Sequence, residues 1–203
     1  MKSSVQSLFP TPIYFSKLQR KFNAEEEKLI NQLSKKVSKN RSNFSSTNTY
    51  VLEMKKLKKI KKELILRIQD YFENVLCYIN VKPFITQSWL NYTKKNEYHH
   101  SHNHPNSIVS GIIYINANKK KDSITFLNEK FKQISPQIKN FNIWNSSTWT
   151  FPIETGDIIL FPSDLVHMVK TKKESNVRIS LSFNIFIKGV VGTEKQLMEL
   201  ELK

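Results

Sequence analysis

The chain has 203 residues and a formal net charge of +15, and 28 of its 32 basic residues are lysine. Its one cysteine, Cys77, excludes an intramolecular disulfide framework or a metal site of several cysteines, and favours a reducing compartment. Hydrophobic residues make up 39% of the chain and aromatic residues 11%, which argues against wholesale disorder. The charge permits an acidic partner such as nucleic acid, although a solvated basic surface explains it more simply.

The first part of the chain predicts one extended segment and two helices. Residues 8–18 read as a short extended segment interrupted by two prolines. A capping asparagine, early glutamates and apolar residues at helical spacing predict a helix over 23–39. Residues 40–50 are polar and loop-like. An apolar stripe predicts a second helix over 57–78, with most of its lysines on the opposite, solvated face.

From Pro83 onward the pattern is typical of β-structure. Short runs rich in β-branched and aromatic residues alternate with turn-forming residues, and no helical pattern separates them. Helices followed by strands predict an α+β fold, in which a helical layer backs an antiparallel sandwich or small barrel. The expected strands cover residues 84–93, 107–116, 123–127, 147–152, 157–162, 165–170 and 177–187.

We expect one domain over residues 1–203, with an N-terminal strand and support helices (1–82), a β core (83–188) and a tail (189–203) able to form a short helix. The insertion 128–147 is a candidate lid or substrate loop. No apolar run reaches the ~20 residues that span a membrane, so we expect a cytoplasmic protein. Pairing of two copies into a homodimer stays open.

Four of the five histidines lie in the segment YHHSHNHPNS, and the fifth is His167. On a strand, His102 and His104 would face the same side and reach one metal ion, with His167 as a third ligand from a later strand. Such a set leaves coordination positions open for small ligands and oxygen. His99 and His100 are expected in an exposed loop or at an entrance. The alternative is a group of surface histidines without a metal.

Arg178 follows His167 by 11 residues and is the one arginine of the β region. Strand alternation places Arg178 and Ser180 on one face. A guanidinium beside a hydroxyl suits a carboxylate, because the guanidinium offers two parallel charge-assisted hydrogen bonds.

The ordered combination of HNHPNS with SGIIYI, GDIILFPSDLVH and RISLSFN resembles the 2-oxoglutarate/Fe(II) oxygenases of the double-stranded β-helix class. More narrowly it is similar to a family of small members common in marine bacteria and phages, whose start the LFPTPIY segment also resembles. The likeness covers most of residues 8–188. It implies a jelly-roll or cupin-like core of antiparallel strands backed by the N-terminal helices.

The resemblance also implies roles for individual residues. His102 takes the place of the first iron ligand and His167 that of the distal one, while Arg178 and Ser180 hold the tail carboxylate of 2-oxoglutarate. His104 departs from the pattern, because a carboxylate usually stands there. We favour a three-histidine iron site over a His104 that lies beside the metal without binding it.

Other residues of the strands carry weaker expectations. Asn91 and Tyr114 either bond the cosubstrate carboxylates or are satisfied polar groups of the core. Trp89, Phe161 and Phe183 are expected simply to fill the core.

The function implied is an Fe(II)- and 2-oxoglutarate-dependent dioxygenase that uses O2 to hydroxylate an unidentified substrate and releases succinate and CO2. Its location would be the cytoplasm of a bacterium, or of the host if a phage encodes it. Two alternatives stay open: a three-histidine dioxygenase of cupin type that needs no keto acid, and a basic module that binds nucleic acid or a virion.

Overall fold

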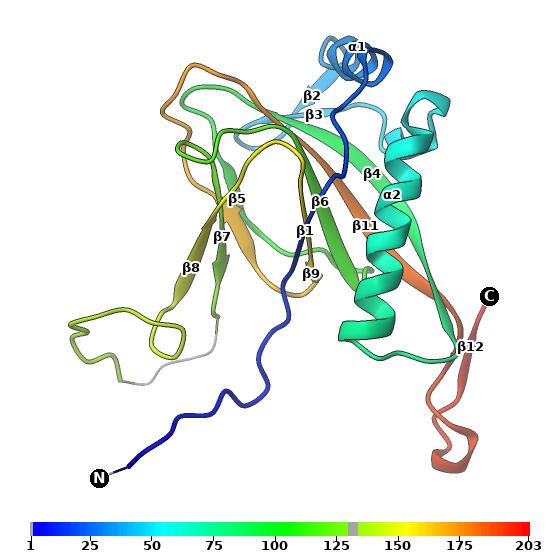
Figure 1. Ribbon diagram of the computed structural model, residues 1–203, viewed down its shortest axis with the longest axis vertical. Coiled ribbons are helices and arrows are strands. Elements are labelled where there is room, and N and C mark those ends of the chain that lie inside the picture. Colours follow the sequence, from blue (N-terminus) through cyan, green and yellow to red (C-terminus); the bar gives the residue numbers. More distant parts are fainter. Residues whose placement is uncertain (1, 130–133) are drawn as a thin grey trace.

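The computed structural model describes residues 2–129 and 134–203, and the strands within these ranges form two antiparallel sheets that face each other (Figure 1). In the smaller sheet the order is β5-β10-β7-β8, and in the larger one it is β1-β9-β6-β11-β4-β3-β2, with β12 paired to β11. The smaller sheet consists of β5 (His99–His102), β10 (His167–Val169), β7 (Ser123–Leu127) and β8 (Thr148–Pro152). The larger sheet consists of β1 (Tyr14–Lys17), β9 (Asp157–Pro162), β6 (Val109–Asn116), β11 (Arg178–Val191), β4 (Val81–Thr93), β3 (Phe44–Ser46), β2 (Val37–Lys39) and β12 (Leu200–Leu202).

The helices cover the larger sheet on the side away from the smaller one (Figure 1). α1 (Ala24–Leu33) begins with a capping box, in which the Asn23 side chain accepts from the backbone N–H of Glu26 and the Glu26 carboxylate accepts from that of Asn23. α2 (Lys58–Asp70) buries one apolar stripe against the sheet. Shorter helical turns lie at Val51–Glu53, Lys55–Leu57, Tyr71–Val75 and Glu194–Gln196.

Alternation along the central strands divides the core into two parts. On β6 and β9, Ile113 and Leu160 face the helices and belong to the larger hydrophobic cluster. Their neighbours Ile112, Tyr114 and Phe161 face the smaller sheet and pack in a second cluster. One face of the larger sheet therefore holds the helical layer, and the other face is left for the space between the sheets.

Two glycines meet packing or backbone needs, one within β6 and one in the turn before β9. A side chain at Gly111 would place its Cβ 2.1 Å from the ring of Phe183, so only glycine fits there. Gly156 has a φ of +92° in the turn that leads into β9. Gly111 thus lets β6 pack closely against Phe183, and Gly156 allows the tight turn that leads into β9.

The predicted α+β architecture is confirmed, and the limits of several elements are corrected. The first helix ends at Leu33 instead of residue 39, because β2 over residues 37–39 pairs with β3, which lies in the stretch expected to be a loop. The second helix ends at Asp70 and continues as a π turn to Val75. The tail forms one short helical turn at Glu194–Gln196 and then β12, whose backbone pairs with the end of β11.

Residues 130–133 of the insertion 128–147 lie outside the described residues, so its role as a lid stays a prediction. Across the described residues, every helix is too short or too polar to cross a membrane.

Candidate active site

Three imidazoles meet in a cavity between the two sheets. His102 ends β5, His104 follows in the next loop, and His167 begins β10 directly opposite His102. Their ligand atoms lie within 4.8 Å of one another. This separation is close to the span of two metal–nitrogen bonds of about 2.1 Å each, so the triad can hold one metal ion.

Backbone carbonyls orient two of the three rings. His102 Nδ1 lies 2.8 Å from the carbonyl oxygen of His100, and His167 Nδ1 lies 3.1 Å from that of Leu165. Because a carbonyl only accepts, each Nδ1 carries the proton and each Nε2 keeps its lone pair. Hydrogen bonds of this kind fix the tautomer and ring position of histidines that bind metals.

Burial keeps these histidines uncharged. Desolvation, followed by the nearby His102, lowers the pKa of His104 to about 4. Desolvation is also the main reason that the pKa of His102 is lowered and that of His167 lies well below its usual value. Neutral imidazoles are the form that binds metal, so the triad is ready to coordinate at neutral pH.

A buried cation also lines the cavity. Arg178 is 4% exposed, and its Nη2 donates to Thr93 Oγ1 at 3.0 Å. Burial lowers the pKa of Arg178, while Tyr114 and Asp122 act in the opposite direction. Within the described residues this is the one hydrogen bond of its side chain, so most of the guanidinium donors have no protein acceptor.

Polar side chains from three neighbouring strands lie beside Arg178. Strand pairing aligns Asn91 on β4, Ser180 on β11 and Tyr114 on β6 in one row across the larger sheet. Asn91 Nδ2 donates to Ser182 Oγ at 3.0 Å, and the buried Asn91 Oδ1 has no partner among the described residues. A buried polar atom without a partner, next to an unsaturated guanidinium, indicates a place for a polar ligand.

The structure brings every residue predicted to bind the metal or the cosubstrate into this one cavity, and the role of each stays a prediction. The residues are Asn91, His102, His104, Tyr114, His167, Arg178 and Ser180.

The reason for the position of His104 differs from the expected one. The prediction assumed one strand through both histidines, but β5 ends at His102. The backbone N–H of His104 instead donates to the Ser163 carbonyl at 2.9 Å, which holds this loop against the β9–β10 connection.

His99 and His100 lie on strand β5 instead of in a loop, and Trp89 is not where it was expected. A β-bulge opposite His167 and Val169 turns His99 to the same side as His102, so that His99 lines the cavity and stacks on the His102 ring at 4.5 Å. His100 is half-buried beside them. Trp89 does not fill the core but lines the cavity, with its ring 5.7 Å from that of His104.

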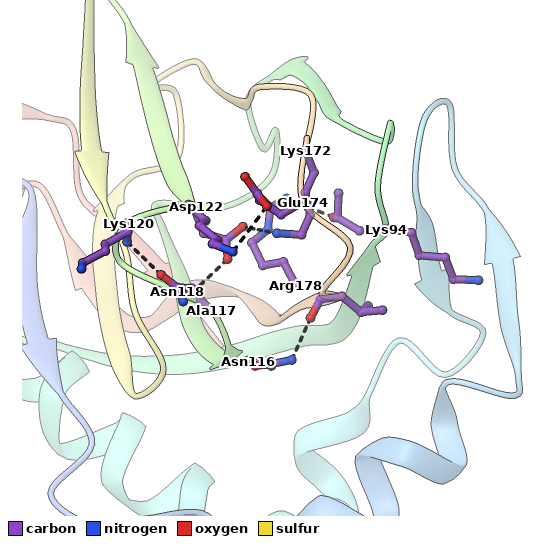
Figure 2. A network of polar contacts seen from close by, with 12 residues as sticks. Lys94, Asn116, Ala117, Asn118, Lys120, Asp122, Lys172, Glu174 and Arg178 are labelled. Carbon is purple, nitrogen blue, oxygen red and sulfur yellow. Dashed lines mark hydrogen bonds and ion pairs between the residues drawn. The ribbon is translucent and has the colours of Figure 1, made fainter.

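Sequence reasoning missed Asp122 and Lys172, which form a buried ion pair behind Arg178 (Figure 2). They stand in the lysine-rich segments NKKKD and KTKKE. Nothing in those segments separates a buried lysine from its solvated neighbours.

We compared the sequence with protein families and curated proteins, and the structure with solved structures. Residues 87–184 match the family described as "Putative 2OG-Fe(II) oxygenase". No curated protein matches this sequence at a significant level.

Solved structures of similar fold come from enzymes of this kind. An oxidoreductase of the 2OG-Fe(II) oxygenase family from Burkholderia pseudomallei is 14% identical, with a TM-score of 0.57, and 84% of this chain and 83% of that one are covered. HygX from Streptomyces hygroscopicus, with nickel, 2-oxoglutarate and hygromycin B bound, is 11% identical, with a TM-score of 0.59 and coverage of 86% and 82%. The α-ketoglutarate-dependent epimerase SnoN from nogalamycin biosynthesis is 12% identical, with a TM-score of 0.63 and coverage of 87% and 78%.

At these identities the structural likeness establishes the double-stranded β-helix fold, and the family match covers the residues of the histidine triad and Arg178. Residues 87–184, just under half of the chain, therefore match the model of the 2-oxoglutarate/Fe(II) oxygenase family, and the described residues share the fold of solved enzymes of that name.

Proposed function

We propose that this protein is an oxygenase in which His102, His104 and His167 bind iron(II), while Arg178 and Ser180 bind the C5 carboxylate of 2-oxoglutarate. The observation that carries the proposal is one cavity with neutral imidazoles in one part and a buried, unsaturated guanidinium in another. A 2-oxo dicarboxylic acid has a matching division, because its keto-acid end chelates metals and its other end is a carboxylate.

The polar groups of the cavity fit this cosubstrate. Among the described residues the Asn91 amide is held by Ser182 alone, whose hydroxyl can donate as well as accept. Turned over, the amide would accept from Ser182 and present its two N–H donors to a carboxylate. Asn91 and Tyr114 are therefore proposed to assist Arg178 at the cosubstrate carboxylates.

When bound, iron(II) and 2-oxoglutarate supply the activation of O2, with the keto acid oxidised to succinate and CO2 as the substrate is oxidised. The chain contributes binding and orientation. The carbonyls of His100 and Leu165 hold the rings of two ligands in place, and Arg178 holds a fixed charge at the far end. The two sheets limit access of water to the triad, and Trp89 forms the wall beside His104.

We propose a site of three imidazoles, with His104 in the usual place of a carboxylate. Such ligands leave the charge of the iron(II) ion at +2, whereas one carboxylate would reduce it to +1. A more positive centre facing Arg178 suits a dianionic cosubstrate. Buried Arg178 also favours this reading over the cupin-type dioxygenase, which needs no keto acid and therefore no carboxylate-binding cation.

The test is anaerobic addition of iron(II) and then 2-oxoglutarate to the purified protein. We expect a weak visible charge-transfer band that saturates with 2-oxoglutarate, and the same band in Arg41→Ala, which removes an exposed arginine of the β2–β3 loop. Protein that binds iron(II) but gives neither the band nor calorimetric binding of 2-oxoglutarate would contradict the proposal and support the cupin-type alternative.

A further inference from the structure

Behind Arg178 lies an ion pair that is almost completely shielded from solvent. Lys172 Nζ donates to Asp122 Oδ1 at 2.8 Å, and each side chain is 1% exposed. Asp122 immediately precedes β7, and Lys172 lies in the connection between β10 and β11 (Figure 2). The pair does not line the cavity, so it is separate from the residues proposed to touch iron or cosubstrate.

Local hydrogen bonds hold both partners in place. Asp122 Oδ2 accepts from the backbone N–H of Asn118 at 2.9 Å (Figure 2). The backbone of Lys172 pairs with the β4–β5 loop, donating to the Glu97 carbonyl at 2.8 Å and accepting from Asn96 at 2.7 Å. Both carboxylate oxygens of Asp122 are thus occupied, one by Lys172 and one by a backbone N–H.

Arg178 shares this buried environment with a carboxylate that it does not bind. Asp122 is near enough for its charge to raise the pKa of Arg178, yet within the described residues the guanidinium bonds only to Thr93. A buried guanidinium and carboxylate normally form a two-fold hydrogen-bonded pair, because each charge is costly without a partner. Here Lys172 takes the carboxylate instead. The two cations and one anion leave a single positive charge on Arg178.

We propose that Lys172 is a positioning residue that acts through Asp122: by binding this carboxylate it prevents Asp122 from pairing with Arg178 and leaves the guanidinium free for the C5 carboxylate of 2-oxoglutarate. The inference rests on the proposed function, since it gives Arg178 a cosubstrate carboxylate to bind. Without the Lys172 ammonium, the Asp122 carboxylate competes inside the protein with the carboxylate of the ligand.

The test measures binding of 2-oxoglutarate to the Ni(II)-loaded protein by calorimetry, which requires no turnover. Lys172→Met and Lys172→Gln are expected to raise the Kd for 2-oxoglutarate at least tenfold while the Ni(II) affinity stays within twofold. Lys172→Gln keeps a hydrogen-bond donor for Asp122, so we expect this variant to fold even if Lys172→Met does not. The matched control is Lys173→Gln, an exposed neighbour that should bind as the wild type does.

Two further measurements separate competition from a merely structural role. Asp122→Asn/Lys172→Gln removes both charges and should restore a Kd within threefold of the wild type. The affinity for 2-oxopentanoate, which has no C5 carboxylate, should be the same in Lys172→Gln and wild type. If both Lys172 variants fail to fold, the Asp122→Asn variant provides the test. Because it removes the competing carboxylate, it should bind 2-oxoglutarate at least as tightly as the wild type does.

Wild-type affinity in Lys172→Gln, a double variant as weak as Lys172→Gln, or weaker binding in Asp122→Asn would each overturn the inference. Failure of the wild-type protein to bind 2-oxoglutarate would instead overturn the proposed function.

Discussion

The two parts of the cavity solve opposite electrostatic problems by different means. The histidine part needs uncharged donors, and burial supplies them by lowering the pKa of the imidazoles. The arginine part needs a lasting charge, and a guanidinium keeps its proton even when burial lowers its pKa. Desolvation therefore prepares one part for a metal ion and leaves the other with an uncompensated cation. The same burial produces two chemically different half-sites.

The largest expected effect comes from breaking the histidine part alone. His167→Ala and His104→Ala should each weaken Co(II) binding ~100-fold or more, since loss even of an outer-shell partner of a metal ligand costs about 10- to 100-fold. Titration of the Co(II) absorption bands measures the affinity. A His104→Ala protein that keeps Co(II) affinity within threefold would show that His104 lies beside the metal without binding it.

Breaking the arginine part should leave the metal in place. Arg178→Ala is expected to weaken binding of 2-oxoglutarate to the Ni(II)-loaded protein by about 30-fold or more, because truncating one partner of a buried charge pair costs roughly 2–5 kcal/mol. Ni(II) affinity should stay unchanged. Arg178→Lys should be intermediate, since an ammonium lacks the planar fork. Equal loss of metal and cosubstrate binding would refute the division of the cavity into two half-sites.

Acid should act on the histidine part first. The folded-state pKa values of His99 and His104 are about 3 and about 4, below the usual 6.5, so between these values the unfolded chain binds more protons than the folded one. Stability of the metal-free protein is therefore full above pH 6.5 and falls as the pH decreases towards 4. Urea unfolding at several pH values measures this slope, which His104→Gln should reduce. An unchanged slope would contradict the buried, neutral state of His104.

The smallest expected effect is on 2-oxoglutarate binding when the hydrogen bond between Thr93 and Arg178 is removed. Thr93→Val removes the one acceptor that Arg178 has in the described part of the chain and should weaken 2-oxoglutarate binding by ~3- to 10-fold, a part of the 1.5–3 kcal/mol typical of a hydrogen bond to a charged group. Thr47→Val, at an exposed threonine, is the control. Calorimetry that finds no difference from wild type would mean that strand β11 alone holds the guanidinium.

Sequence patterns predicted most of the central strands, because strands of this length depend on local periodicity, whereas β2 and β3 were missed and His104 reaches the cavity from a loop. Alternation placed Arg178 and Ser180 on one face of a strand, and both residues line the cavity. His99 was misplaced because a β-bulge shifts the alternation, and a bulge has no reliable signature in one sequence. In the tail, the short helical turn agrees with the expectation, and β12 was missed because it forms only by pairing with β11.

By itself, the amino-acid sequence determined the α+β order, the histidine-rich segment and the isolated arginine, since periodicity and residue chemistry are local properties. Only the tertiary structure decided which lysine is buried, which carboxylate it meets and how His99 and Trp89 turn towards the triad. Asp122 and Lys172 are 50 residues apart, and their partnership arises where separate loops close one end of the sandwich. Burial and charge pairing are properties of that enclosure, and no run of neighbouring residues encodes them.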